Sequence, residues 1–443
     1  MMETTMSPVF EKFLKRFMFA IEGLLIVGTF TLINAFALRG MTQFPDVESI
    51  TGLERTLLID CFVMLLFVAI LLSVKGVWAE FISSWKRNWP LVLFLAYAIF
   101  SAFWSVFLNA TMYKLVFLIF SSVSASYLAI RLGLSGLISL LSWVAGFFIL
   151  ASLLMITLTP SGIMQNEPFV GSWVGVFWHR NHAGSLFAFF SALFLMRYLW
   201  DMGAARINKL VFLLLYILSV VLVIGCRSAT GIIVFIFLNA LSILISLWLL
   251  YYHRMKAWHY YLSSLILLTA LLVFLLNTDY FFGLLGRSPN MTGRVPLWQD
   301  LFFNFFTSKP WFGHGYGALW MQQDFRHLMQ ERHGWRYEVF FADNGFFDIA
   351  LNLGLVGLSM FILYYFHQTH RAISGLVHAR RWQPAMPVIA ISYVFIGNLT
   401  YSFLLEVDQF VWLLLVIWGF AGRDIREPVP QSETSQILDQ TKN

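Results

Sequence analysis

Long apolar stretches separated by short polar turns recur along most of the chain. A membrane-spanning helix needs roughly 20 mostly apolar residues, and twelve stretches approach that length. The pattern therefore predicts an all-α, polytopic membrane helix bundle of about twelve transmembrane helices. The expected spans are about 17–38, 56–74, 90–108, 112–130, 137–158, 183–198, 210–225, 229–251, 260–276, 345–366, 387–403 and 409–420.

One long segment, 277–343, interrupts this alternation and is rich in Phe and Trp. Within it, residues 296–307 predict a short amphipathic helix, because Leu297, Leu301 and Phe305 recur at a spacing of four. Such a helix is expected to lie in the membrane interface. The expected organisation is a polar N-terminus (1–16), nine helices (17–276), this loop (277–343), three more helices (344–420) and a polar, disordered tail (421–443).

Lys and Arg fall mostly on one side of these spans. If the N-terminus is cytoplasmic, the inner segments hold 18 of the 29 Lys and Arg residues, and the short outer loops hold 5. The remaining 6 lie in the long loop, where the positive-inside rule has little force. The bias predicts that both termini are cytoplasmic and that the 277–343 loop lies on the outer face.

Composition excludes a soluble enzyme. Hydrophobic residues make up 59% of the chain and charged residues 12%, whereas a soluble domain carries about 25% charged residues. The net charge of +6 mostly records topology here, so no nucleic-acid partner is expected. Only two cysteines occur, and no ATP-binding loop, zinc-protease motif or serine-hydrolase motif is present. We therefore expect no metal and no cofactor.

Several arginines stand close to the predicted outer ends of the spans. Arg227 lies in a short break between two spans, and Arg294 precedes the amphipathic helix, so each is placed near a helix N-terminus. Arg287 and Arg180 lie in the neighbouring outer segments. A guanidinium fork suits phosphate oxygens, so these residues predict an anion site on the outer face. Snorkelling or solvated arginines are the alternative interpretation.

Candidate acid–base residues (His314, His333 and Asp343) and candidate substrate-binding residues (Tyr316 and Asn344) lie in or beside the long loop. His314 and Tyr316 belong to a glycine-rich turn, and His333 follows in the same loop. Asp343 and Asn344 stand directly before the 345–366 span, where ordinary helix capping is the alternative interpretation. His179 and His182 are three residues apart but have no accompanying carboxylate, which disfavours a metal site there.

Two acidic pairs on the outer face have the spacing that can hold a divalent cation, and solvated loops are favoured for both. They are Asp46 with Glu48 and Glu406 with Asp408.

Arginines on the outer face, aromatic side chains such as Trp298 and the lack of a metal motif together describe a site for a lipid-linked diphosphate. The aromatic side chains would pack against sugars and lipid, while the arginines would neutralise the leaving diphosphate.

Several short motifs occur in order between about residues 170 and 420. They are 175–184 (GVFWHRNHAG), 226–228 (CRS), 286–298 (GRSPNMTGRVPLW), 313–317 (GHGYG), 344–346 (NGF) and 354–357 (GLVG). With the spans and the long loop, the set resembles the superfamily of O-antigen ligases and of O-antigen and exopolysaccharide polymerases. The first stretch is similar to one that is common in the exopolysaccharide polymerase branch.

The resemblance implies a metal-independent glycosyltransferase of the bacterial inner membrane. Its donor would be a glycan on undecaprenyl diphosphate, with Arg227 and Arg294 as the diphosphate ligands. A polymerase would use a second lipid-linked glycan as the acceptor, and a ligase would use the lipid A core. The polymerase is the preferred interpretation, in contact with membrane lipid and with polysaccharide assembly partners. A transporter or flippase of a lipid-linked glycan is the alternative from another class.

One position departs from the family pattern. The family usually has His immediately before the Asn-Gly that opens the tenth span, as a candidate base for the acceptor hydroxyl, and this chain has Asp343 there. A carboxylate can also accept that proton, so Asp343 is the expected base, with His314 and His333 as substitutes. A nearby arginine is expected to lower the pKa of Asp343.

Overall fold

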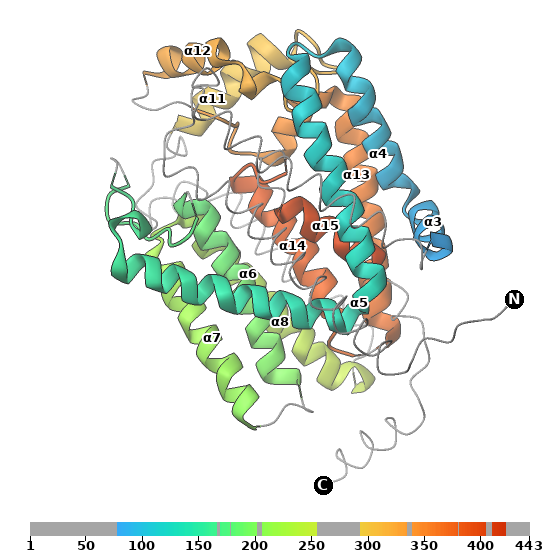
Figure 1. The fold of residues 1–443 in the computed structure, drawn as a ribbon, viewed down its shortest axis with the longest axis vertical. Helices are drawn as coiled ribbons and strands as arrows, with labels where there is room; N and C mark the ends of the chain where they lie inside the picture. The colour runs from blue at the N-terminus through green and yellow to red at the C-terminus, as the bar shows by residue number, and fades with distance from the viewer. Residues whose placement is uncertain are drawn as a thin grey trace, which may run out of the picture.

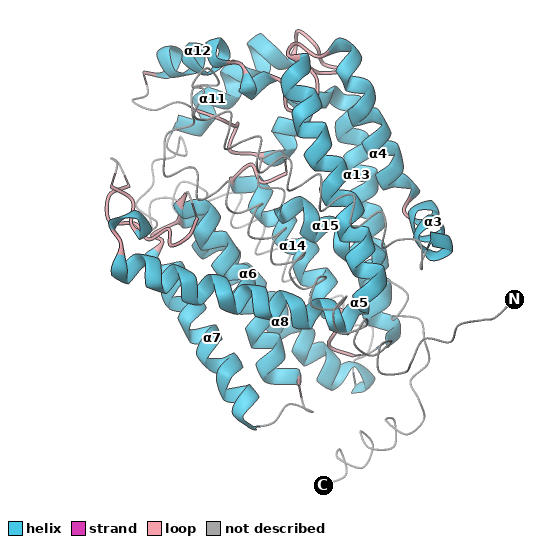
Figure 2. Cartoon of the chain, viewed as in Figure 1, coloured by secondary structure: helices cyan, strands magenta, loops and turns pink. Residues whose placement is uncertain are grey.

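The computed structural model describes residues 78–165, 169–177, 179–201, 206–254, 293–334, 339–379, 381–404 and 410–421. Within these ranges the chain is helical, without strands, and an isolated bridge joins Ile163 to Trp173 (Figure 2). The expected spans 17–38, 56–74 and 260–276 lie outside the described residues. So do Arg287 and both acidic pairs.

Five described helices are long and apolar enough to cross a membrane, judged by length and composition. They are α5 (Leu108–Leu158), α6 (Arg180–Trp200), α7 (Arg206–Gly225), α8 (Ala229–Tyr251) and α13 (Gly345–Ala379). Three shorter apolar helices accompany them: α4 (Trp89–Phe100), α14 (Ala385–Thr400) and α15 (Phe410–Phe420). The prediction of an all-α, multi-span protein is confirmed, and the count of twelve spans stays a prediction.

Helix α5 consists of two helical segments joined at a bend. Gly133 has a φ of 61° inside it, a left-handed conformation that glycine adopts without a steric penalty. The bend falls between the expected spans 112–130 and 137–158. Helix α5 packs mainly on α15 and also contacts α4, α6 and α7; in Figure 1 its two legs run in different directions from the bend.

The described helices form two neighbouring groups. Helices α6, α7 and α8 pack on one another, while α4, α13, α14 and α15 form the second group (Figure 1). Helix α14 contacts both α8 and α6 and so joins the groups. Large apolar side chains on the outside of α7, including Ile207, Leu214 and Ile224, are exposed, as expected for a surface that faces lipid.

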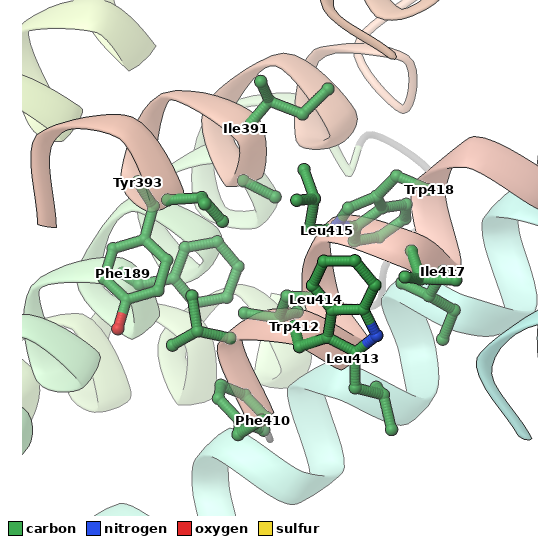
Figure 3. Packing of buried hydrophobic residues seen from close by; sticks show 14 of the residues in the cluster. Phe189, Ile391, Tyr393, Phe410, Trp412, Leu413, Leu414, Leu415, Ile417 and Trp418 are labelled. Atoms are coloured by element: carbon green, nitrogen blue, oxygen red, sulfur yellow. The ribbon is translucent and has the colours of Figure 1, made fainter. Parts of the chain in front are cut away.

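Helix α15 lies at the centre of the core, and all of its residues are buried. Figure 3 shows its side chains interleaved with those of α6 and α14. Tyr393 stacks on Phe189 with ring centroids 5.1 Å apart. The indole of Trp412 donates a 2.8 Å hydrogen bond to Ser122 Oγ, so this buried polar group is satisfied inside the bundle.

A small helical unit covers one end of the bundle (Figure 1). It consists of α11 (Arg294–Asp300), the π-helix η6 (Leu301–Phe306), the short 3₁₀-helix η7 (Leu319–Met321) and the polar helix α12 (Gln323–His333). Helix α11 and η6 confirm the predicted short helix. Helix α12 was not expected, and neither was the short helix α3 (Trp78–Arg87), which precedes α4. The apolar stripe packs inward, and Phe305 meets Phe325 of α12 at 4.9 Å. Leu297, Leu301 and Phe305 therefore pack against α12, and the expected place of the short helix in the membrane interface stays a prediction.

Helix α13 is broken at Gly354, which has a φ of 67°. The loop 310–315 lies across the break and exchanges main-chain hydrogen bonds with it. Leu355 N and Val356 N donate to the carbonyls of Pro310 and Trp311, at 2.8 and 3.2 Å. In return, the amides of His314 and Gly315 donate to the carbonyls of Leu351 and Asn352, at 3.1 and 2.8 Å. The loop thus satisfies main-chain groups near the break.

Candidate functional site

The turn between α7 and α8 presents Arg227. Its φ is 49°, a left-handed conformation that is uncommon for a residue with a side chain. Helix α6 holds the turn at two points: Arg180 Nη1 donates to the Arg227 carbonyl at 2.8 Å, and Ser228 Oγ donates to Asn181 Oδ1 at 2.8 Å. Ser228 Oγ also accepts from Gly231 N at 3.0 Å and so caps α8.

A loop ahead of α6 covers the same turn. Trp173 N donates to the Gly225 carbonyl at 2.9 Å, and the Trp173 ring lies so close to Gly225 that a Cβ there would overlap it. The Arg180 guanidinium lies 4.0 Å from the centroid of the Phe169 ring. The Arg227 side chain itself is exposed, and no described residue forms a hydrogen bond or ion pair with its guanidinium. A fixed main chain therefore carries a free cation.

The second charged turn carries Asp343, directly before α13. Asp343 also has a positive φ, of 56°. Arg294 Nε, from the first residue of α11, donates to Asp343 Oδ2 at 2.8 Å, and the two side chains are 20% and 27% exposed. Asn344 Oδ1 accepts from Phe346 N and Phe347 N at 3.1 Å each. Asn344 therefore caps α13, which leaves the Asp343 carboxylate to Arg294.

The residue before Asp343 is held at both of its main-chain polar groups. Trp298 Nε1 donates to the Ala342 carbonyl at 2.6 Å. Ala342 N donates to both carboxylate oxygens of Asp348, at 3.2 and 3.1 Å. Asp348 also accepts from Trp320 Nε1 at 2.6 Å and from Ser402 Oγ. This buried carboxylate therefore ties α13 to the segments on either side of it.

Aromatic rings connect the two charged turns. His179 stacks on Tyr401 with centroids 5.7 Å apart, and Tyr401 meets Phe341 at 4.8 Å. The His179 ring also meets Phe169, at 5.9 Å. At one end of this series, the Phe169 ring lies under the Arg180 guanidinium, which binds the Arg227 carbonyl. At the other end, Phe341 lies two residues before Asp343. The rings therefore form a continuous link between the two turns.

Burial, together with the positive charges of Arg180 and Arg294, lowers the pKa of His179 to about 3. The imidazole is therefore neutral, and its Nδ1 accepts from Asn181 N at 3.2 Å.

The pKa of Asp343 is raised above its ordinary value, because burial outweighs the opposing charge and hydrogen bond of Arg294. The expectation that a neighbouring arginine would lower this pKa overall is therefore wrong. The arginine acts in the expected direction, but the loss of solvent around the carboxyl is the larger effect. A raised pKa makes the ionised Asp343 a stronger proton acceptor.

His314 and Tyr316 help to build the loop that crosses the break in α13. The buried His314 Nδ1 lies 3.0 Å from the Leu351 carbonyl, to which it donates as the protonated nitrogen. Burial lowers the pKa of His314 despite this bond. Tyr316 is 1% exposed, and its amide donates to Ser101 Oγ at 3.0 Å. These contacts give both residues a place in the packing between α4 and α13.

His333 lies at the end of α12, where its Nε2 is 3.3 Å from Asp300 Oδ2. Arg332 Nη1 reaches the other oxygen of Asp300 at 2.7 Å. These pairs attach α12 to α11. Among the described residues, no three His, Cys, Asp or Glu side chains are grouped so that they could hold a metal ion.

The site contains residues that sequence reasoning did not select: His179 for a role other than metal binding, Tyr401 and Asp348. A carboxylate in the first turn of an apolar helix was the available signal for Asp348. Nothing in the sequence around Tyr401 indicates its place beside His179.

Residues 214–362 match the family model described as O-Antigen ligase. The matched segment contains the Arg227 turn, α11, α12, the Asp343 turn and the broken part of α13. The match confirms the resemblance to the ligase and polymerase superfamily, on a segment that includes both charged turns. No curated protein sequence matches the chain.

Proposed function

We propose, from the premise that this chain carries an O-antigen ligase family domain at residues 214–362, that it is a membrane glycosyltransferase. It would transfer a glycan from undecaprenyl diphosphate to the hydroxyl of an acceptor glycan, on the outer face of the bacterial inner membrane. The reaction would need no metal, because arginines supply the positive charge. The preferred activity is that of a polymerase of exopolysaccharide or O-antigen type.

The observation that carries this proposal is the conformation of two charged residues. Among the described residues, Arg227 and Asp343 alone combine a side chain with a positive φ. Such conformations cost energy and persist where the surroundings impose them, often at functional sites. The aromatic link through His179 and Tyr401 joins the two turns. Two strained turns that present a cation and a carboxylate to one region suit a reaction that needs both.

The arginines would bind the diphosphate of the donor. Arg227 offers an exposed guanidinium on a rigid turn. Arg294 uses Nε for Asp343, and no described residue occupies its Nη atoms. The guanidinium fork can therefore hold Asp343 and still present donors to phosphate oxygens. Charge that builds up on the leaving diphosphate would be stabilised by groups that are already in place.

Asp343 would act as the base. The acceptor hydroxyl oxygen attacks the anomeric carbon of the donor sugar, and its proton passes to the Asp343 carboxylate. The bond between the anomeric carbon and the phosphate oxygen breaks, and undecaprenyl diphosphate leaves with the electron pair. A single displacement of this kind inverts the configuration at the anomeric carbon. The raised pKa of Asp343 supports proton transfer in this direction.

Polar residues inside the helices favour transfer over transport. Asn239 donates to Ser191 Oγ at 2.9 Å, and Asn398 Oδ1 accepts the amides of Phe403 and Leu404. These groups are engaged in local hydrogen bonds, whereas a transport site gathers polar groups near the middle of the membrane. The exposed Arg227 instead lies in the turn directly before α8.

The choice of polymerase over ligase rests on the 175–184 stretch, whose resemblance is to exopolysaccharide polymerases. Part of this stretch forms the start of α6, which holds the Arg227 turn through Arg180 and Asn181. A polymerase would produce chains of many repeats from the lipid-linked donor alone. A ligase would produce a single transfer and only when the lipid A core is supplied.

The test uses the purified full-length protein in lipid vesicles, with a lipid-linked glycan from the source bacterium. Product length is read with and without added lipid A core. Asp343→Asn is expected to slow transfer by about 10²–10⁴-fold, and Arg227→Lys and Arg294→Lys to lose most activity because lysine lacks the fork. Arg197→Lys, on α6 away from the two turns, is the matched control. Transfer by Asp343→Asn at the wild-type rate would exclude Asp343 as the base.

Orientation is tested separately. The 277–343 loop is expected on the outer face, because the distribution of Lys and Arg favours that side. A reporter that is active only outside the cytoplasm should be active when fused after Gln322. Activity of a cytoplasmic reporter at that position instead would contradict both the topology and the proposed outer-face reaction.

A further inference from the structure

The main chain of Ala342 forms hydrogen bonds with side chains of two helices, α11 and α13. Trp298 Nε1 of α11 donates to its carbonyl at 2.6 Å, and Asp348 of α13 accepts its amide at 3.2 and 3.1 Å. Ala342 is fully buried. We call Ala342 with these two side chains the Ala342 clamp.

The clamp acts directly on the conformation of Asp343. A left-handed φ is unfavourable for a residue with a side chain, so the chain adopts it where neighbouring contacts require it. The clamp fixes the residue before Asp343, and Asn344 begins the capping of α13 immediately after it. Asp343 is therefore held from both sides in the backbone conformation that accompanies its pairing with Arg294.

Helix α11 contributes twice to this arrangement. Arg294 and Trp298 are four residues apart and so share one face of a helix. Arg294 pairs with the Asp343 carboxylate, while Trp298 holds the carbonyl of the preceding residue. The helix thus contacts the side chain of Asp343 and the peptide unit before it. Movement of α11 would displace the carboxylate and its arginine together.

Asp348 anchors the other side of the clamp. It is 1% exposed and accepts hydrogen bonds from Trp320 Nε1 and Ser402 Oγ as well as from Ala342 N. The positive charge of Lys114 also acts on it. A buried carboxylate with several donors is rigid, because removing any partner leaves a polar group unsatisfied.

We propose that Trp298 and Asp348 are positioning residues that set the conformation of Asp343, and that neither touches the substrate. The inference rests on the proposed function only for its effect on catalysis. The clamp itself is a structural claim. It reassigns Trp298, which sequence reasoning placed among the substrate-binding residues, to a role that acts through the Ala342 carbonyl.

The first test is independent of activity. Arg294→Cys and Asp343→Cys are combined in a chain with Cys61→Ser and Cys226→Ala, and the rate of cross-linking by a short bifunctional thiol reagent is measured. Adding Trp298→Phe, which removes one hydrogen-bond donor, is expected to slow cross-linking about fivefold. Asp348→Asn should slow it at least as much. Trp412→Phe is the matched control, since it removes the indole donor to Ser122 in the core, and should leave the rate unchanged.

The second test concerns catalysis. Trp298→Phe should lower kcat about tenfold with little change in KM, and the double variant Trp298→Phe/Asp343→Asn should be no slower than Asp343→Asn alone. A role in stacking on sugar would instead raise KM, and the two effects would multiply. Either that result or an unchanged cross-linking rate in Trp298→Phe would overturn the inference.

The two proposals can fail separately. If Asp343→Asn transfers glycan at the wild-type rate, the assignment of the base is wrong, yet the cross-linking experiment still decides whether the clamp sets the conformation of residue 343. If the cross-linking rate does not respond to Trp298→Phe or Asp348→Asn, the clamp is wrong while Asp343 is still tested by its own variant.

Discussion

The two charged turns use the same backbone conformation in different ways. At the α7–α8 turn, Arg180 and Asn181 of α6 hold the turn while the Arg227 side chain stays exposed. At the turn before α13, the charged side chain is itself part of the network, because Asp343 pairs with Arg294. The first turn therefore carries a charge that folding does not need. In the second turn, the carboxylate that we propose as the base also takes part in the folded network.

The largest expected effect is the loss of activity when either charge is removed by glycine, which also relieves the strain at a positive φ. Arg227→Gly and Asp343→Gly should each lower the rate of glycan transfer by roughly 10²–10³-fold, the effect typical of losing one preorganised catalytic group. Their stabilities should differ. Arg227→Gly should unfold at the same temperature as the wild type or higher, whereas Asp343→Gly should unfold at a lower temperature because Arg294 loses its partner. Thermal unfolding in detergent measures this, and equal shifts for the two variants would contradict the comparison.

The next effect concerns the support of the Arg227 turn. Arg180→Met replaces the arginine by an apolar side chain of similar length and so removes the donor to the Arg227 carbonyl. An unsatisfied main-chain group should cost about 1–3 kcal/mol of stability, and activity should fall because the turn loosens. Arg197→Met is the matched control: Arg197 also lies on α6 and over an aromatic ring, Phe212, at 4.2 Å. Its pairing with Asp201 is partly exposed, so little stability should be lost and activity should persist.

The pH dependence tests the second turn. The pKa of Asp343 is raised by burial, so transfer should increase with pH through a pKa above the ordinary value for Asp, as the carboxylate that accepts the proton forms. Stability should change in the opposite sense: burial favours the protonated form, so its contribution is present below the unfolded pKa and is lost as pH rises through the folded pKa. Arg294→Gln should move the acidic limb of the activity profile, normalised to its maximum, to higher pH. An unmoved limb would show that another group limits the rate.

The smallest effect is expected at His333. Its pairing with Asp300 attaches α12 to α11, and a single ion pair contributes about 0–1 kcal/mol. His333→Asn should therefore keep transfer within about twofold of the wild type, as judged from that modest contribution. A loss as large as that of Asp343→Asn would instead make His333 the base.

Hydropathy located the helices well where burial in an apolar environment decides the structure. The expected span 229–251 coincides with α8. Helix α13 extends beyond its expected end at 366, because the polar residues Gln368 and Arg371 form hydrogen bonds with Asn88 Oδ1 at 3.0 and 2.7 Å. Helix α12 was missed for a similar reason: its sequence is polar, and Phe325 and Met329 anchor it.

The charged members of the site could be found because charges at the ends of apolar helices are conspicuous. Arg227, Arg294 and Asp343 are of this kind. The role of Trp298 could not be deduced, because it depends on a carbonyl 44 residues away in the chain. Asn344 was expected to bind substrate, but its hydrogen bonds cap α13, and its part in substrate binding stays a prediction. No periodicity encodes such tertiary pairings.

The break in α13 limits which part of the molecule can act as a gate. The loop 310–315 supplies carbonyl acceptors to the amides of Leu355 and Val356, and its own amides donate to carbonyls of α13. Lifting it would leave main-chain groups without partners in an apolar medium, at several kcal/mol each. The loop is therefore held in place against α13. Entry of the proposed lipid-linked substrate is therefore expected to depend on motion elsewhere, and slow amide hydrogen exchange at Leu355 and Val356 should persist when that substrate is added.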